Sequence, residues 1–248
     1  MSETVPPGTV VRRHLLATRV WHWVNAVAVI VLLGSGLGIS NAHRRLYWGA
    51  YGANFDPAWL EVPRFPEWIT IPGYYSLALS RRWHLFFALV LGFGLLAYMV
   101  ASLLNRHFRR KLAIRRGELA PAHVWADFRA HLDLRFHDPE APDQYNLFQK
   151  LSYGLVLFVA LPLAILTGMA LSPWLNATFP WILDLLGGRQ SARSVHFITS
   201  AGIALFTAVH LALVILAGAW NEVRSMVTGK WRVPEGTPQS TTSRGPAQ

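Results

Sequence analysis

Four long apolar stretches restrict the possible folds of this chain more than any other feature of its sequence. They lie at about residues 20–39, 83–104, 151–171 and 195–219. Each is close to the roughly 20 residues that an α-helix needs to cross the hydrocarbon core of a bilayer. An unpaired backbone N–H or C=O is costly in lipid, and the short alternating segments of a membrane β-barrel are absent. We therefore expect an all-α membrane protein built as a four-helix transmembrane bundle.

The segments between these stretches are too short for a separate catalytic domain of ordinary size. We expect one four-helix transmembrane domain over residues 1–232, with a short helix at about 122–132 in the middle loop. Residues 233–248 are rich in Ser, Thr, Gly, Pro and Gln, which predicts a disordered tail. The first stretch has no small-residue cleavage site and precedes three further spans, so it reads as a retained helix and not a signal peptide.

The basic residues are concentrated in three segments. Sixteen of the 23 Lys and Arg residues lie before the first span, between the second and third spans, or after the fourth. By the positive-inside rule these segments face the cytoplasm, which places both termini there. We therefore expect a multi-pass protein of the bacterial inner (cytoplasmic) membrane. Topology and contact with anionic membrane lipid account for this charge, so we expect no nucleic-acid binding.

The chain contains no cysteine. This excludes disulfides, thiolate-held iron–sulfur clusters and the CxxCH attachment of c-type haem. Any metal must be held by histidine, methionine or carboxylate side chains. Ionisable residues inside a membrane span are expensive and are usually functional. Of ten histidines, four lie within the apolar stretches: His22, His84, His196 and His210.

The order of the spans predicts which of these histidines meet. His196 and His210 are 14 residues apart, about 21 Å of helix and nearly four whole turns, so they share one helix face at two depths. With both termini inside, His84 and His196 fall in the outer half of the membrane. His22 and His210 fall in the inner half. We refer to these as the outer pair and the inner pair, and two such pairs are typical of bis-imidazole ligation of two haems.

Other residues near these depths fit the same reading. Gly36 is 14 residues after His22 and lies at the level of the outer pair, where a small residue admits a porphyrin edge. Arg19 at the inner end, and Arg82 and Arg193 at the outer end, are candidate partners for haem propionates. Anchoring of these arginines in lipid headgroups is an equally open alternative.

The strings RVWHWVN at 19–25 and RWH at 82–84, with the two histidines of the fourth span, resemble a known superfamily. It is the dihaem cytochrome b subunit superfamily of Ni,Fe-hydrogenases, formate dehydrogenases (gamma subunit) and thiosulfate reductases, of the bacterial b561 type. The strings SGL at 35–37, NAH at 41–43, YWG at 47–49 and NEVRSM at 221–226 are most similar to the thiosulfate reductase branch. The resemblance implies two haem b groups, one held by the outer pair and one by the inner pair.

The resemblance also implies a quinone site. Relatives of the formate dehydrogenase type carry a Tyr-Asn-x-x-Gln-Lys motif at the start of their third span, and this chain has the same polar positions at 145–150. Asn146 and Gln149 are therefore candidate quinone-binding residues. Phe148 replaces a glycine of those relatives, which narrows or moves the pocket. Ordinary polarity at the start of a helix is the alternative explanation for both residues.

These features favour an electron-transfer subunit over a self-contained enzyme, because no independent substrate-oxidising site is visible. We expect this subunit to transfer electrons between a periplasmic oxidoreductase and the quinone pool. A molybdenum-cofactor enzyme is the favoured partner, and a hydrogenase is the second choice. The long outward segment 40–82 is rich in Trp and Tyr and offers a place to dock. Two alternatives stay open: a stand-alone quinol oxidase of the b561 type, and a haem-free transporter or proton relay that uses the intramembrane histidines.

Overall fold

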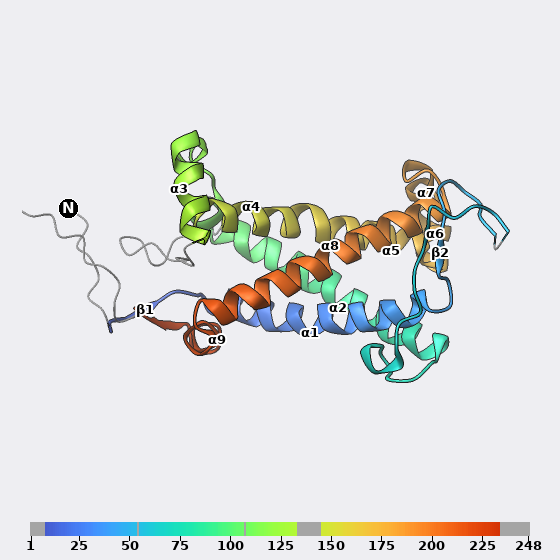
Figure 1. Ribbon diagram of the computed structural model, residues 1–248, viewed down its shortest axis with the longest axis horizontal. Coiled ribbons are helices and arrows are strands. Elements are labelled where there is room, and N and C mark those ends of the chain that lie inside the picture. Colours follow the sequence, from blue (N-terminus) through green and yellow to red (C-terminus); the bar gives the residue numbers. More distant parts are fainter. Residues whose placement is uncertain (1–7, 54, 107, 133–144, 234–248) are drawn as a thin grey trace, which may run out of the picture. The chain divides into compact units, whose positions relative to one another are not determined.

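The computed structural model describes residues 8–53, 55–106, 108–132 and 145–233. The predicted disorder of the tail beyond residue 233 therefore lies outside the described residues. The elements in chain order are as follows (Figure 1): β1 (Val10–Arg12), α1 (Leu16–Ser40), β2 (Arg45–Leu46), β3 (Leu60–Glu61), η1 (Glu67–Ile69), α2 (Leu77–Leu104), η2 (Phe108–Leu112), η3 (Arg116–Leu119), α3 (Pro121–Leu132), α4 (Leu147–Leu155), η4 (Val156–Ala160), α5 (Leu161–Leu171), α6 (Pro173–Thr178), α7 (Trp181–Leu185), α8 (Arg189–Leu216), α9 (Ala219–Thr228) and β4 (Lys230–Arg232).

The predicted fold class is confirmed. Four helices are long and apolar enough to cross a membrane: α1, α2, the continuous run Leu147–Leu171, and α8. Each begins a few residues before its predicted span. The fourth ends at Leu216, short of the predicted residue 219, because Gly218 adopts a left-handed backbone with φ of 99° and starts α9. The predicted helix of the middle loop is also present, as α3.

The third span contains a π-helical turn, η4, between α4 and α5. Pro162 follows it in the first turn of α5 and has no backbone N–H for a hydrogen bond to the preceding turn. A wider turn accommodates this missing donor without ending the helix. The span therefore stays continuous from Leu147 to Leu171.

The faces of the four spans that point away from the protein interior are apolar. In the most apolar stretch of each helix, only 11% of α8 and 28% of α1 is buried within the protein. Large side chains such as Ile30, Phe93 and Leu205 are 62%, 69% and 67% exposed. In water such exposed apolar faces would cause aggregation, whereas in a membrane they contact apolar lipid chains. The chain is therefore a multi-pass membrane protein.

By its internal contacts the chain divides into two compact units, and the predicted single domain over 1–232 stays a prediction. The larger unit, residues 20–105 and 153–211, holds most of the four spans and is called the helical unit here. Close approach of α1 and α2 within it depends on glycine, because a Cβ on Gly38 would collide with the Ser80 hydroxyl. Nearer the other end of α1, Trp21 stacks on Tyr98 of α2 with ring centres 5.3 Å apart.

The segment after α1, residues 41–61, is hydrogen-bonded to the first turns of α8 within the helical unit. Trp59 Nε1 donates to Ser194 Oγ at 2.9 Å, and that hydroxyl donates to the Tyr47 carbonyl at 2.6 Å. The backbone N–H of Gly49 donates to Ser191 Oγ at 2.7 Å. This outward segment also contains the antiparallel pair β2–β3. It is therefore a structured loop with a fixed attachment to α8.

The second unit contains residues from 1–19, 106–152 and 212–248. In it β1 pairs antiparallel with β4. Arg13 binds Glu222 at 3.1 Å and lies over the ring of Trp231, whose Nε1 donates to Glu222 at 2.9 Å. A second ion pair joins Lys150 Nζ to Glu118 at 2.8 Å, with side chains only 6% and 19% exposed. These contacts join segments far apart in the sequence.

Candidate functional site

The structure brings the four intramembrane histidines together in the pairs that the topology predicts. His84 of α2 and His196 of α8, the outer pair, have ring centres 6.1 Å apart and ring planes at 70°. His22 of α1 and His210 of α8, the inner pair, have ring centres 6.4 Å apart and planes at 61°. All four belong to the helical unit. Since α8 is unbroken between His196 and His210, the pairs stand about 21 Å apart along it.

These separations fit two imidazoles on opposite sides of one metal ion. A metal–imidazole bond of about 2 Å on each side, with about 1 Å from ring nitrogen to ring centre, separates opposed ring centres by about 6 Å. Direct hydrogen bonding between the two rings would bring them closer. Among the described residues, no group of three or more His, Asp or Glu side chains could hold a metal ion. The donor set therefore suits a metal whose other ligands come from a macrocycle, as in haem.

The outer pair is flanked by two equivalent hydroxyl groups. Ser35 Oγ of α1 lies 3.1 Å from His84 Nδ1, and Thr167 Oγ1 of α5 lies 2.8 Å from His196 Nδ1. The contacts of these two hydroxyl groups with the histidines were not predicted from the sequence. Both hydroxyl residues directly precede a glycine, and this shared dipeptide was visible in the sequence. The sequence does not show how each helix is rotated about its axis, and this rotation decides whether the dipeptide faces a histidine.

Those glycines lie against the same two rings. A Cβ on Gly36 would lie 3.5 Å from His84 Cε1, and a Cβ on Gly168 would lie 3.5 Å from His196 Cε1. Gly36 is thus at the level of the outer pair, where the helix spacing predicts it. Its role toward a porphyrin stays a prediction. Gly168 has the same relation to His196, and this contact was not predicted from the sequence.

The inner pair has different surroundings. His22 Nδ1 and Asn25 Oδ1 are buried polar atoms with no hydrogen-bond partner among the described residues. Phe206 stacks on His210, with ring centres 5.8 Å apart and planes at 11°, and Tyr153 meets the edge of Phe206. A buried polar atom without a partner is costly, so the surroundings of the inner pair differ from the hydrogen-bonded surroundings of the outer pair.

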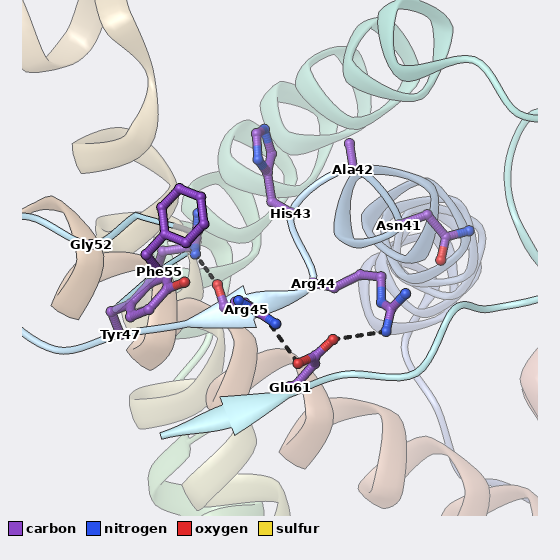
Figure 2. Close-up of a pocket in the computed structure, with 10 residues that line it drawn as sticks. Asn41, Ala42, His43, Arg44, Arg45, Tyr47, Gly52, Phe55 and Glu61 are labelled. Atoms are coloured by element: carbon purple, nitrogen blue, oxygen red, sulfur yellow. Dashed lines mark hydrogen bonds and ion pairs between the residues drawn. The ribbon is translucent and has the colours of Figure 1, made fainter. Parts of the chain in front are cut away.

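Arg193 lines a cavity of about 730 Å³ together with Arg44 and Arg45. Figure 2 shows Arg44, Arg45 and Glu61 in this cavity. Arg193 donates to the Arg45 carbonyl, while its Nε is buried with no hydrogen-bond partner among the described residues. Arg44 and Arg45 both pair with Glu61, at 3.0 and 3.1 Å, so one carboxylate serves two cations there. The cavity therefore suits an anionic group.

His43 lines the same cavity. Partial burial, and then the charges of Arg193 and Arg81, lower the pKa of His43 below its ordinary value. Proton uptake by His43 is thus disfavoured in the folded protein.

The other two predicted propionate partners are not in this cavity. Arg82 is exposed at the start of α2. Arg19 belongs to the second unit, where its guanidinium donates to the Val227 carbonyl. Their proposed contacts with haem remain predictions.

The candidate quinone residues form a reciprocal cap at the start of α4. Asn146 Oδ1 accepts from the Gln149 backbone N–H at 2.9 Å, and Gln149 Oε1 accepts from the Asn146 backbone N–H at 3.3 Å. This capping box satisfies two backbone donors at the helix start. The next residue, Lys150, forms the ion pair with Glu118. Helix capping therefore explains part of this polar motif, and quinone binding stays a prediction.

Comparison with known proteins gives one family and several relatives. The family described as prokaryotic cytochrome b561 matches residues 13–229. A putative protein-methionine-sulfoxide reductase subunit of Azospira oryzae is 29% identical over 80% of this chain and 87% of that protein. Probable Ni/Fe-hydrogenase B-type cytochrome subunits are 26% identical in Cupriavidus necator, over 85% of this chain and 82% of that protein, and 24% in Azotobacter vinelandii, over 93% and 92%. No solved structure matches the chain.

Proposed function

The chain belongs to the prokaryotic cytochrome b561 family, and from that premise we propose that it is a dihaem b membrane subunit that carries electrons between a periplasmic redox partner and membrane quinone. The observation that carries this proposal is the presence of two histidine pairs, with ring centres 6.1 and 6.4 Å apart, each of which has one member on the continuous helix α8. Haem b, when bound, supplies one-electron redox chemistry at each level. The two histidines of each pair would hold one haem, and the rest of the chain would set the spacing between the pairs and provide low-polarity surroundings.

The outer pair is the proposed entry or exit point for electrons on the partner side. The aromatic outward loop is hydrogen-bonded to α8 at Ser191 and Ser194, close to His196 in sequence. A partner that docks on this loop is thereby positioned next to the helix that holds one ligand of the outer pair. Arg193 and Arg82 are proposed to meet haem propionates at this end, with lipid headgroups as the alternative. With basic segments in the cytoplasm, the proposed location is the bacterial inner membrane.

The proposed partner is an oxidoreductase subunit. The relatives are named as subunits of a methionine-sulfoxide reductase and of Ni/Fe-hydrogenases. We favour a molybdenum-cofactor enzyme, with a hydrogenase as the second choice. The thiosulfate reductase branch stays a prediction, since these relatives carry other names.

Quinone is the proposed redox partner inside the membrane. Asn146 and Gln149 are the candidate residues, because they occupy the polar positions of the similar motif and each side-chain amide carries both donors and an acceptor. Phe148 between them replaces the glycine of the similar motif and is proposed to change the shape of the pocket. Arg19 is proposed for the propionates of the haem at the inner pair.

The deciding experiment is a haem count on the purified full-length protein in detergent, by absorption spectrum and haem extraction. We expect about two b haems per chain and two titrating centres in a potentiometric titration. A colourless protein after expression with ample haem supply would instead favour the transporter or proton relay. Quinol oxidation by the isolated chain, without any partner, would favour the stand-alone quinol oxidase. Co-purification of a cofactor-bearing subunit would identify the partner.

A further inference from the structure

The outer histidine pair sits between two matching Ser/Thr–Gly dipeptides. In α1, Ser35 hydrogen-bonds with His84 Nδ1 and Gly36 lies against the same ring. In α5, Thr167 hydrogen-bonds with His196 Nδ1 and Gly168 lies against that ring. Each dipeptide therefore makes the same two contacts with one histidine. Ser35 and Thr167 are both fully buried, so water does not compete for these bonds.

The protons of the two hydroxyls are already directed elsewhere. Ser35 Oγ donates to the Val31 carbonyl at 2.6 Å, and Thr167 Oγ1 donates to the Leu163 carbonyl at 2.7 Å. A hydroxyl has a single proton and a carbonyl oxygen can only accept. Toward the imidazole, each hydroxyl oxygen is therefore the acceptor and the ring nitrogen is the donor. This network assigns the proton to Nδ1 of both His84 and His196.

A proton on Nδ1 leaves the lone pair of Nε2 free in both rings. Histidines that bind metals commonly donate their other ring N–H to an acceptor, which fixes the tautomer and makes the ligating nitrogen a stronger donor. A stronger nitrogen donor favours the ferric state and lowers the reduction potential of a haem. At the inner pair the buried Nδ1 of His22 has no such acceptor among the described residues. The outer pair therefore has hydroxyl acceptors for the Nδ1–H groups of its histidines, whereas His22 of the inner pair has none among the described residues.

We infer that Ser35 and Thr167 are positioning residues that hold both outer histidines in the Nδ1–H tautomer and lower the potential of the haem bound there. The inference rests on the proposed function, since it needs a haem at the outer pair. It adds to that function a difference in reduction potential between the two haem centres. Two hydroxyls on two helices tune one centre and leave the other unchanged.

The test is a potentiometric titration of the purified full-length protein with haem bound, for the wild type and five variants. Thr167→Val removes the hydroxyl and keeps the side-chain volume close to that of Thr, Ser35→Ala removes the second hydroxyl, and Thr167→Ser retains one. The matched control is Thr207→Val, because Thr207 of α8 donates to the Ile203 carbonyl at 2.8 Å and, within the described part of the chain, forms no hydrogen bond with a histidine ring. The outer centre is identified as the one lost in His84→Ala.

We expect Thr167→Val and Ser35→Ala each to raise the potential of the outer centre and leave the inner centre in place. A tenfold loss of ferric preference would raise the potential by about 59 mV for a one-electron couple. Thr167→Ser should behave like the wild type, and Thr207→Val should leave the outer centre unchanged. The low-spin ferric EPR signal of the outer centre alone should change in the first two variants.

Equal shifts of both centres, or an unchanged outer centre with haem retained, would overturn the inference. Loss of the outer haem from Thr167→Val but not from Thr167→Ser would support it, whereas loss from both would assign Thr167 a packing role only and overturn it. Ser35→Ala tests the second hydroxyl independently. A wild type without two titrating centres would defeat the proposed function itself, before any variant is compared.

Discussion

His22 and His210 approach each other from α1 and α8, with ring centres 6.4 Å apart, although they stand near opposite ends of the chain. The contact makes the first and fourth spans neighbours within the helical unit. His84 and His196 do the same for the second and fourth spans. The fourth span therefore takes part in both pairs, and this arrangement underlies the first prediction.

Removing one histidine should remove one haem. His84→Ala or His196→Ala should eliminate the outer centre, and His22→Ala or His210→Ala the inner one, because a single remaining imidazole leaves the iron without its second axial ligand. The haem count should fall from about two to about one per chain. Haem extraction and potentiometric titration measure both quantities. His123→Ala, an exposed histidine in α3, serves as the control and should retain both centres.

Asn146 and Gln149 can be tested for quinone binding without breaking their helix cap. Asn146→Asp and Gln149→Glu keep the side-chain oxygens that accept the two backbone N–H groups, but remove the amide donors. We expect a weaker apparent quinone affinity with little change in thermal stability. Asn146→Ala should also lose about 1 kcal/mol of stability, as removal of a cap does. Unchanged quinone kinetics in the Asp and Glu variants would reduce the motif to a capping role.

Gly188 should not tolerate a side chain. Its φ is +102°, and a Cβ there would lie 2.6 Å from Ala50 Cα. Gly188→Ala should therefore lower the free energy of unfolding in detergent by about 1–3 kcal/mol, through backbone strain and displacement of the outward loop. Gly92→Ala is the matched control, because a Cβ on Gly92 within α2 would meet no atom within 4 Å. If both variants unfold at the same temperature, this close approach is not important for stability.

The ion pair between Lys150 and Glu118 should behave as a buried pair. With side chains 6% and 19% exposed, loss of one partner leaves a poorly solvated charge. We expect Lys150→Met or Glu118→Leu alone to cost about 3 kcal/mol, and the double variant to cost less than the sum of the two. Denaturant unfolding of the four proteins gives the coupling energy. The exposed pair Arg44–Glu61 provides the comparison and should be worth at most about 1 kcal/mol.

Acid should destabilise the protein through His43. Its folded-state pKa is lowered, first by partial burial and then by Arg193 and Arg81, so below pH 6.5 the unfolded chain binds more protons at this residue than the folded protein does. Stability is thus fully present above 6.5 and falls as the pH drops through that value. His43→Gln should lose less stability on acidification, as melting temperatures measured against pH will show. At pH 8, where the imidazole is neutral in both states, protonation of His43 should no longer destabilise the protein.

The four spans were predictable because bilayer thickness fixes their length, and lipid requires an apolar run of that length. The pairing of the histidines was also predictable, since helix rise and alternating direction give each residue a depth. Depth alone was sufficient to match His84 with His196. The position of Gly36 beside His84 follows from the same spacing.

The hydrogen bonds between the two buried hydroxyl groups and the outer histidines were not predictable in this way. The bonds from Ser35 and Thr167 depend on how α1 and α5 are rotated about their axes, and nearly uniform apolar surfaces do not encode that rotation. The short helices α6 and α7 were missed because the loop before α8 was analysed only as a connection. The turn η4 depends on the local response to Pro162, which can also kink or end a helix.

One feature of α8 has a mechanical consequence. The outward loop holds its first turns through Ser191 and Ser194, and the same unbroken helix carries His196 and His210. A helix of this length behaves as a stiff rod, so an axial displacement of its outer end moves both imidazoles together by the same amount. A protein that pushed or pulled on the loop would therefore move the ligand histidines of both pairs at once. In the proposed dihaem subunit, α8 would thus connect docking on the loop mechanically with the surroundings of the haem at the inner pair.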